Sequence, residues 1–187
     1  LGAKVGTNSG LLEMYRAGMP SWEAVRLAED KLSGVVPVMV LFEGAPDSML
    51  DPDMLSRIDQ VESAMQAEPA VRWTLSPASA VRRIHRALTG EARLPSERDL
   101  VAQEVLLVDI SGEHPLDPVL SEDRGRARIQ ALLTDAGGQV YLPLRARIEA
   151  AAGEAFAGTN VQIAVTGDGF LAASGVDRLI GDLLKSV

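Results

Sequence analysis

Cysteine is absent from this chain of 187 residues, so disulfide bonds, thiolate metal sites and cysteine nucleophiles are all excluded. Histidine occurs only twice, at His85 and His114, which leaves little for histidine-based catalysis. Aromatic residues are also scarce, with two Trp, two Tyr and three Phe, and they do not indicate an aromatic-lined pocket. These absences remove several common enzyme chemistries.

Positive charge and long apolar runs are scarce as well. The chain has 26 acidic and 18 basic residues and a formal net charge of −8, which argues against nucleic acid or anionic lipid headgroups as partners. Its longest stretch without a charged residue, from 155 to 167, is shorter than the roughly 18 apolar residues of a membrane-spanning helix. The hydrophobic content of 47% is typical of one or two compact soluble units.

The two ends carry no sign of a complete protein. The first residue is Leu1, and the final residues 180–187 contain no helix breaker. No basic segment followed by an apolar one marks a signal peptide. We therefore expect a domain excised from a longer protein.

The first half of the chain predicts a helix, a strand, a second helix and a second strand. Residues 20–34 have apolar positions at helical spacing, followed by Gly34 as a C-terminal cap. Residues 35–42 form a continuous apolar run, which is typical of a strand buried on both faces. Asp51 and Pro52 predict the start of a helix that ends before Pro69. Residues 71–75 complete a β-α-β unit.

A second β-α-β unit follows later in the chain. Residues 126–134 alternate between polar and apolar like a half-buried strand. A helical period covers 138–157, and 160–166 alternates again as a closing strand. Two such units in series predict an α+β protein with a ferredoxin-like split β-α-β sandwich, in which the first and third strands lie side by side at the centre of a single sheet.

The residues between the two units predict a helical insertion. The connection is too long for an ordinary loop, and it contains helical patterns at 77–88 and at about 96–111, the second with a capping box from Ser96 and Asp99. We expect the two helices to pack together beside the sheet, because neither apolar face could stay exposed alone. The predicted organisation of this one domain is an N-terminal segment and helix at 1–34, the first unit at 35–75, the insertion at 76–123, the second unit at 124–167 and a C-terminal amphipathic helix at 168–187.

Two motifs could carry ligand chemistry, but each has a structural explanation. Residues 167–172 match G-x-G-x-x-A between a strand and a helix, the position of a pyrophosphate-binding turn. No later strand with an acidic residue follows, so a turn that requires glycine is favoured. Asp47, Asp51 and Asp53 could supply oxygen ligands to calcium. Because the rest of a calcium loop is missing and Asp51 is explained as a helix cap, ordinary loop roles are favoured.

The remaining candidate residues also favour structural roles. The six methionines are soft ligands that could hold Cu(I), but Met39, Met54 and Met65 lie in patterns typical of core packing. His85 is expected on a helix surface and His114 in a loop, because neither belongs to a catalytic or metal-binding spacing. The insertion's arginines, at positions 82, 83 and 86, fit a solvated or salt-bridging face. The sequence thus predicts no catalytic residue, no metal site, no cofactor and no enzyme activity, and it identifies no substrate-binding residue.

The order of several short segments resembles one protein family. The segments are Thr7-Asn-Ser-Gly-Leu-Leu12, Leu41-Phe-Glu-Gly44, Asp51-Pro-Asp-Met-Leu55, Leu100-Val-Ala-Gln-Glu-Val-Leu-Leu107 with Ser111-Gly112, Arg124-Gly-Arg-Ala-Arg-Ile129 and Val165-Thr-Gly167. In this order and spacing they resemble the RND (resistance-nodulation-division) superfamily of exporters. The chain is most similar to the first large periplasmic loop of the MmpL-like and hopanoid-exporter-like branch.

The resemblance implies a periplasmic porter domain of a proton-driven exporter in the inner membrane. Such a domain would guide a hydrophobic, amphiphilic or lipid-like substrate, beside the second periplasmic loop and the transmembrane helices of the same parent protein. The family's proton-relay carboxylates would lie in those helices and outside this chain. The alternative is a stand-alone ligand-sensing or protein-interaction module, for which the ferredoxin-like sandwich is also a common scaffold.

Overall fold

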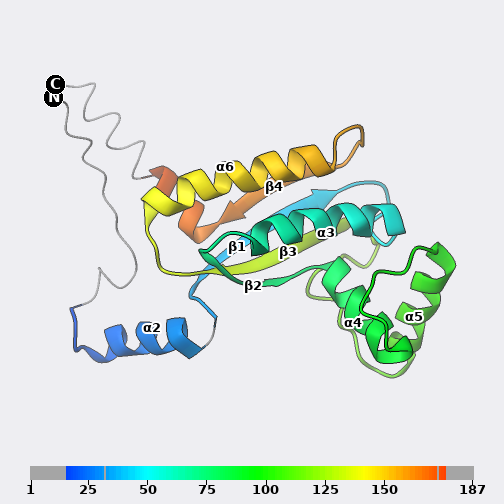
Figure 1. The fold of residues 1–187 in the computed structure, drawn as a ribbon, viewed down its shortest axis with the longest axis horizontal. Coiled ribbons are helices and arrows are strands. Elements are labelled where there is room, and N and C mark those ends of the chain that lie inside the picture. The colour runs from blue at the N-terminus through cyan, green and yellow to red at the C-terminus, as the bar shows by residue number, and fades with distance from the viewer. Residues whose placement is uncertain (1–15, 32, 172, 176–187) are drawn as a thin grey trace.

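The protein has an α+β fold built on a four-stranded antiparallel sheet (Figure 1). The computed structural model describes residues 16–31, 33–171 and 173–175. The first of the segments that carry the family resemblance, at residues 7–12, lies outside this range. So does most of the predicted C-terminal helix, of which 168–171 and 173–175 are described and helical.

The strands are β1 (Val36–Glu43), β2 (Val71–Leu75), β3 (Arg126–Leu133) and β4 (Gln162–Gly167). Their order across the sheet is β2-β3-β1-β4, and every neighbouring pair is antiparallel. β1 and β3 therefore lie side by side at the centre, as the sequence predicted. All four strands fall where the β-patterned runs placed them.

Helices α3 (Pro52–Gln66) and α6 (Gly138–Ala155) pack along the same side of the sheet (Figure 1). Each follows a central strand, and each turns its apolar stripe towards the sheet. The main core lies between these two layers, where the rings of Phe42 and Phe156 stack with their centroids 4.8 Å apart. By contrast, α2 (Pro20–Lys31) buries none of its residues.

The expectation that the first strand is buried on both faces is wrong. In β1 the residues Val36, Val38, Val40 and Phe42 are buried, whereas the residues between them are exposed or half-buried. An antiparallel sheet can leave one face uncovered, and here both covering helices lie on the other side. The run is apolar throughout because both its core-facing positions and most of its accessible positions carry apolar side chains.

The insertion contains α4 (Pro77–Thr89) and α5 (Arg98–Ile110), which pack together at one end of the sheet (Figure 1). They enclose a second apolar cluster, which includes Leu55 of α3. α4 ends at Gly90, whose φ of 84° is the left-handed conformation expected of this cap. The predicted capping box at Ser96 is wrong, because Glu97 occupies the N-cap of α5 and forms no side-chain cap bond.

The G-x-G-x-x-A segment is a turn that requires glycine for close packing. A Cβ atom at Gly167, where φ is +151°, would lie 2.6 Å from the carbonyl oxygen of Pro37. A Cβ atom at Gly169 would lie 2.6 Å from a methyl group of Val36. The glycines thus allow the end of β4 and the following helical turn to approach β1, as the structural explanation predicted.

Candidate functional site

Several apolar side chains are accessible on the uncovered face of the sheet. Period-two alternation places the residues that lie between the buried ones on this face. Pairing across β1 aligns Leu41 with Ala164 of β4, and Pro37 with Leu132 of β3. The apolar residues of this face, called the open face below, are Pro37, Met39, Leu41, Trp73, Leu132 and Ala164. The same pairing places the polar Arg128, Gln130 and Thr166 beside Met39 and Leu41.

Two large apolar side chains stand out on the open face. Trp73 of β2 pairs with Leu132 and is 41% exposed, and Leu41 of β1 is 38% exposed. Trp73 reaches this face because a register irregularity between Val71 and Trp73 shifts the strand against β3. Apolar patches of this kind mark contact with apolar ligands or partners. A sheet with helices on one face was predicted, but the sequence did not reveal that Leu41 and Trp73 would be accessible on the other face, because they lie in runs that predict burial.

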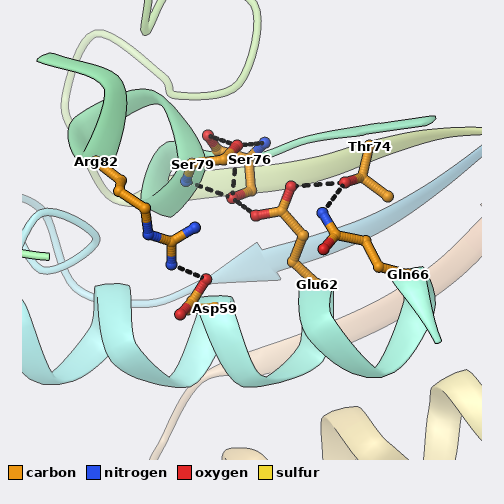
Figure 2. A network of polar contacts seen from close by, with 7 residues as sticks. All are labelled: Asp59, Glu62, Gln66, Thr74, Ser76, Ser79 and Arg82. Atoms are coloured by element: carbon orange, nitrogen blue, oxygen red, sulfur yellow. Dashed lines mark hydrogen bonds and ion pairs between the residues drawn. The ribbon is translucent and has the colours of Figure 1, made fainter. Parts of the chain in front are cut away.

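A polar network joins the main sheet to the insertion (Figure 2). Glu62 of α3 is 1% exposed, and its carboxylate accepts hydrogen bonds from the hydroxyls of Thr74 (2.8 Å) and Ser76. Ser76 also caps α4, where its hydroxyl accepts from the backbone N–H of Ser79 at 3.0 Å. Arg82 of α4 forms an ion pair with Asp59 of α3. The network therefore links α3 to the end of β2 and to the first turns of α4.

This network does not have the composition of a catalytic site. A serine nucleophile requires a base that can take its proton and a third group that orients the base. Here the carboxylate of Glu62 binds the Ser76 hydroxyl directly, and both of its oxygens have protein donors. The arginine at position 82 salt-bridges across to a neighbouring helix, which agrees with the salt-bridging alternative for that face. The polar network around Glu62 and Ser76 therefore has a structural role, in which it connects α3 to α4.

His85 is buried, and its predicted place on a helix surface is wrong. Its side chain is 2% exposed, and Nδ1 lies 2.7 Å from Oε1 of Glu104, a buried residue of α5. The other ring nitrogen, Nε2, has no hydrogen-bond partner in the described part of the chain and lies 3.9 Å from the carboxylate of Glu91. Helix periodicity missed this pair because the two residues come from different helices. His114 is exposed in a loop, as predicted.

The three aspartates considered for calcium do not converge on a common point. Asp53 binds Arg57 at 3.0 Å, and Asp51 binds Arg98 at 3.0 Å. Asp51 does occupy the N-cap of α3, but its side chain makes no cap hydrogen bond, so this part of its predicted role is wrong. Across the described residues, no group of three or more His, Cys, Asp or Glu side chains could hold a metal ion.

The methionines are used mainly for packing. Met65 and Met49 are fully buried in the main core, and Met54 packs against it. Met39 was expected in a buried strand, but it lies half-buried on the open face. Thioether side chains adapt to irregular surfaces, so Met39 adds a deformable contact to that face.

Comparison with known proteins gives no family assignment. The chain matches no protein-family profile, and no curated protein sequence matches it significantly. Within the described part of the chain, no helix is both long and apolar enough to span a bilayer.

Proposed function

We propose that this chain is a periplasmic porter domain of a proton-driven RND-type exporter. In this role it binds or guides a hydrophobic or amphiphilic, lipid-like substrate on the open face and performs no chemistry of its own. The observation that carries the proposal is the accessible apolar surface on one side of the sheet, with Trp73 and Leu41 exposed on it.

The strand order supports the porter-domain part of the proposal. The order β2-β3-β1-β4 with antiparallel neighbours is the order of a ferredoxin-like split β-α-β sandwich, the fold that the family resemblance implies. The helical pair inserted between the two halves also fits that resemblance. In such an assembly the open face would adjoin the second periplasmic loop of the same protein, and a substrate would pass between the two surfaces.

Tryptophan fluorescence can test whether the open face binds an amphiphile. The chain has only two tryptophans, at positions 22 and 73, so Trp22→Phe leaves Trp73 as the only reporter and Trp73→Phe leaves Trp22. We expect monomeric dodecyl maltoside to shift the emission of Trp73 to the blue with saturation, because the indole leaves water. The emission of Trp22 should change little under the same conditions.

Matched substitutions locate the binding. Leu41→Asp places a charge on the open face and should abolish the shift of Trp73. Leu27→Asp changes an exposed leucine of α2 and should leave the shift intact. If both variants respond like the parent, or if both tryptophans shift together, the open face is not the binding surface.

The parent gene tests the exporter assignment against a stand-alone ligand-sensing or protein-interaction module. An exporter requires an apolar segment of about 20 residues on each side of this domain. Polar flanking linkers would instead support the stand-alone module, for which the same open face would serve as a ligand or partner surface. Sequencing the gene beyond both ends separates the two.

A further inference from the structure

A groove lies where the insertion returns to the sheet. It has a volume of about 380 Å³. It is bordered by the C-terminal half of α5, by Leu50 at the end of the loop that leads into α3, and by the chain from 116 to 124. The size falls within the range of small-molecule sites. Its lining consists of Leu50, Val105, Asp109, Leu116, Asp117, Leu120, Ser121, Glu122 and Arg124.

The floor of the groove is apolar. Leu50, Val105 and Leu116 are buried members of the second apolar cluster, and Leu120 packs against the same cluster. These side chains are largely buried, so only their outer edges reach the groove and offer a small apolar contact to a short alkyl chain.

The rim of the groove is acidic and largely unpaired. Elsewhere arginines neutralise carboxylates, as in the pairs of Arg57 with Asp53 and Arg147 with Glu68. At the rim, by contrast, Asp117, Glu122 and Arg124 form no ion pair among the described residues. Asp109 has only a contact of 3.4 Å with Nδ1 of the exposed His114. With three carboxylates and one guanidinium, the lining carries a net negative charge that attracts cations.

The wall of the groove is held in a fixed shape. Its backbone turns back at Arg124, which has a left-handed φ of 51°, an uncommon conformation for a residue other than glycine. The turn is secured because the hydroxyl of Ser121 and the amide of Gly125 both donate to Asp123, at 2.5 and 3.1 Å. These two hydrogen bonds hold the pKa of Asp123 below its usual value, and the bond from the Ser121 hydroxyl has the larger effect. Strained positions of this kind occur often at functional sites.

From these features we infer that the groove binds a cationic amphiphile. The ammonium or guanidinium head would lie at the carboxylates of Asp109, Asp117 and Glu122, and a short apolar tail would lie on the leucine floor. The inference rests on the groove alone and is independent of the proposed exporter role, because the open face is a different surface made of different residues.

Titration with octyltrimethylammonium below its micelle concentration tests the inference, with amide shifts followed by two-dimensional NMR. We expect saturable shifts centred on residues 116–124. Octyl maltoside has the same tail without the charge and should bind more weakly, and octyl sulfate should not bind there. Added salt should weaken the cation's binding, because rim charges are screened.

Three variants separate local recognition from overall charge. The double variant Asp117→Asn/Glu122→Gln should weaken binding of the cation about five-fold, as expected for two exposed charge contacts. The control Glu23→Gln/Glu154→Gln removes the same charge from exposed positions outside the groove and should have no effect. Arg124→Asn should tighten binding about two-fold, and asparagine tolerates the left-handed backbone.

Three results would overturn the inference. Equal weakening by the two double variants would mean that the cation responds only to net charge. Equal binding of octyl maltoside and octyltrimethylammonium would mean that the acidic rim plays no part. Binding of octyl sulfate at residues 116–124, lost in Arg124→Asn, would make the groove an anion site.

Discussion

Replacing Ser76 by alanine should destabilise the protein far more than replacing Thr74 by valine. Both changes remove one hydroxyl that donates to the carboxylate of Glu62 (Figure 2). They differ in access to water, because Ser76 is fully buried and Thr74 is half-buried. The comparison therefore combines the cost of leaving a buried carboxylate oxygen without a donor with the loss of the N-cap that Ser76 provides.

The magnitudes follow from the contacts. Among the described residues, Ser76 is the only donor to Oε2 of Glu62, and a hydrogen bond to a charged group contributes about 1.5–3 kcal/mol. Ser76 also provides the N-cap of α4, whose loss costs about 1 kcal/mol. We expect Ser76→Ala to lower the free energy of unfolding by about 3–4 kcal/mol. Thr74→Val should cost about 1 kcal/mol, because Thr74 is half-buried and a water molecule can take the place of its hydroxyl as donor to Glu62.

Urea denaturation followed by tryptophan fluorescence measures both changes, provided that the m-values stay constant. Repeating Ser76→Ala in a Glu62→Gln background completes a double-mutant cycle, in which part of the loss should disappear. If Ser76→Ala and Thr74→Val had equal effects, or if the Glu62→Gln background left the loss unchanged, the reasoning about the buried carboxylate would be refuted.

Three further substitutions test other parts of the fold. Gly167→Ala should cost about 3 kcal/mol by urea denaturation, because its Cβ atom would overlap the backbone of β1, whereas Gly158→Ala, at an open left-handed position, should cost only about 1–2 kcal/mol. Glu104→Leu leaves Nδ1 of the buried His85 without its hydrogen-bond partner and should cost about 2 kcal/mol, more than Glu104→Gln, which keeps an acceptor. Hydrogen bonds from Arg147 lower the pKa of Glu68, so the carboxylate stabilises the fold above about pH 5 and this stabilisation disappears as the pH falls through the lowered pKa. Glu68→Gln should therefore reduce stability at pH 7, and the loss should shrink once the pH is low enough to protonate Glu68 in the folded protein; a loss that persists through acid titration of the carboxylates would contradict the role of the ion pair.

Local patterns were sufficient to predict the strands and most helices. Residues 126–134 alternate in polarity because Ile129 and Leu133 face the core while Arg128 and Gln130 face away. α3 and α4 were equally clear, since proline stands at the start of each and an apolar stripe follows. In these elements buried and exposed positions alternate with the period of the helix or strand. The pattern of polar and apolar residues is therefore enough to predict the element.

The accessible surfaces could not be predicted, because they depend on which elements meet in space. Leu41 and Trp73 have the residue types of a core, and only the placement of α3 and α6 on one side leaves them accessible. His85 is buried because its partner Glu104 comes from the neighbouring helix. The groove likewise combines α5, the 116–124 chain and Leu50. All of these features depend on contacts between elements that are distant in the sequence, so no short stretch of sequence predicts them.

One segment of the insertion contributes to both accessible surfaces. The carbonyl oxygen of Pro118 accepts hydrogen bonds from the side chains of Arg128 (2.6 Å) and Gln130 (2.9 Å), which project from β3 on the uncovered side of the sheet. Its neighbours Asp117 and Leu120 line the groove. These two polar side chains pair with Leu41 and Met39 of β1, so a polar pair held by the insertion lies among the apolar residues of the open face. A ligand that moved Arg128 or Gln130 would release the wall of the groove, so the two surfaces share a support even though they share no lining residue.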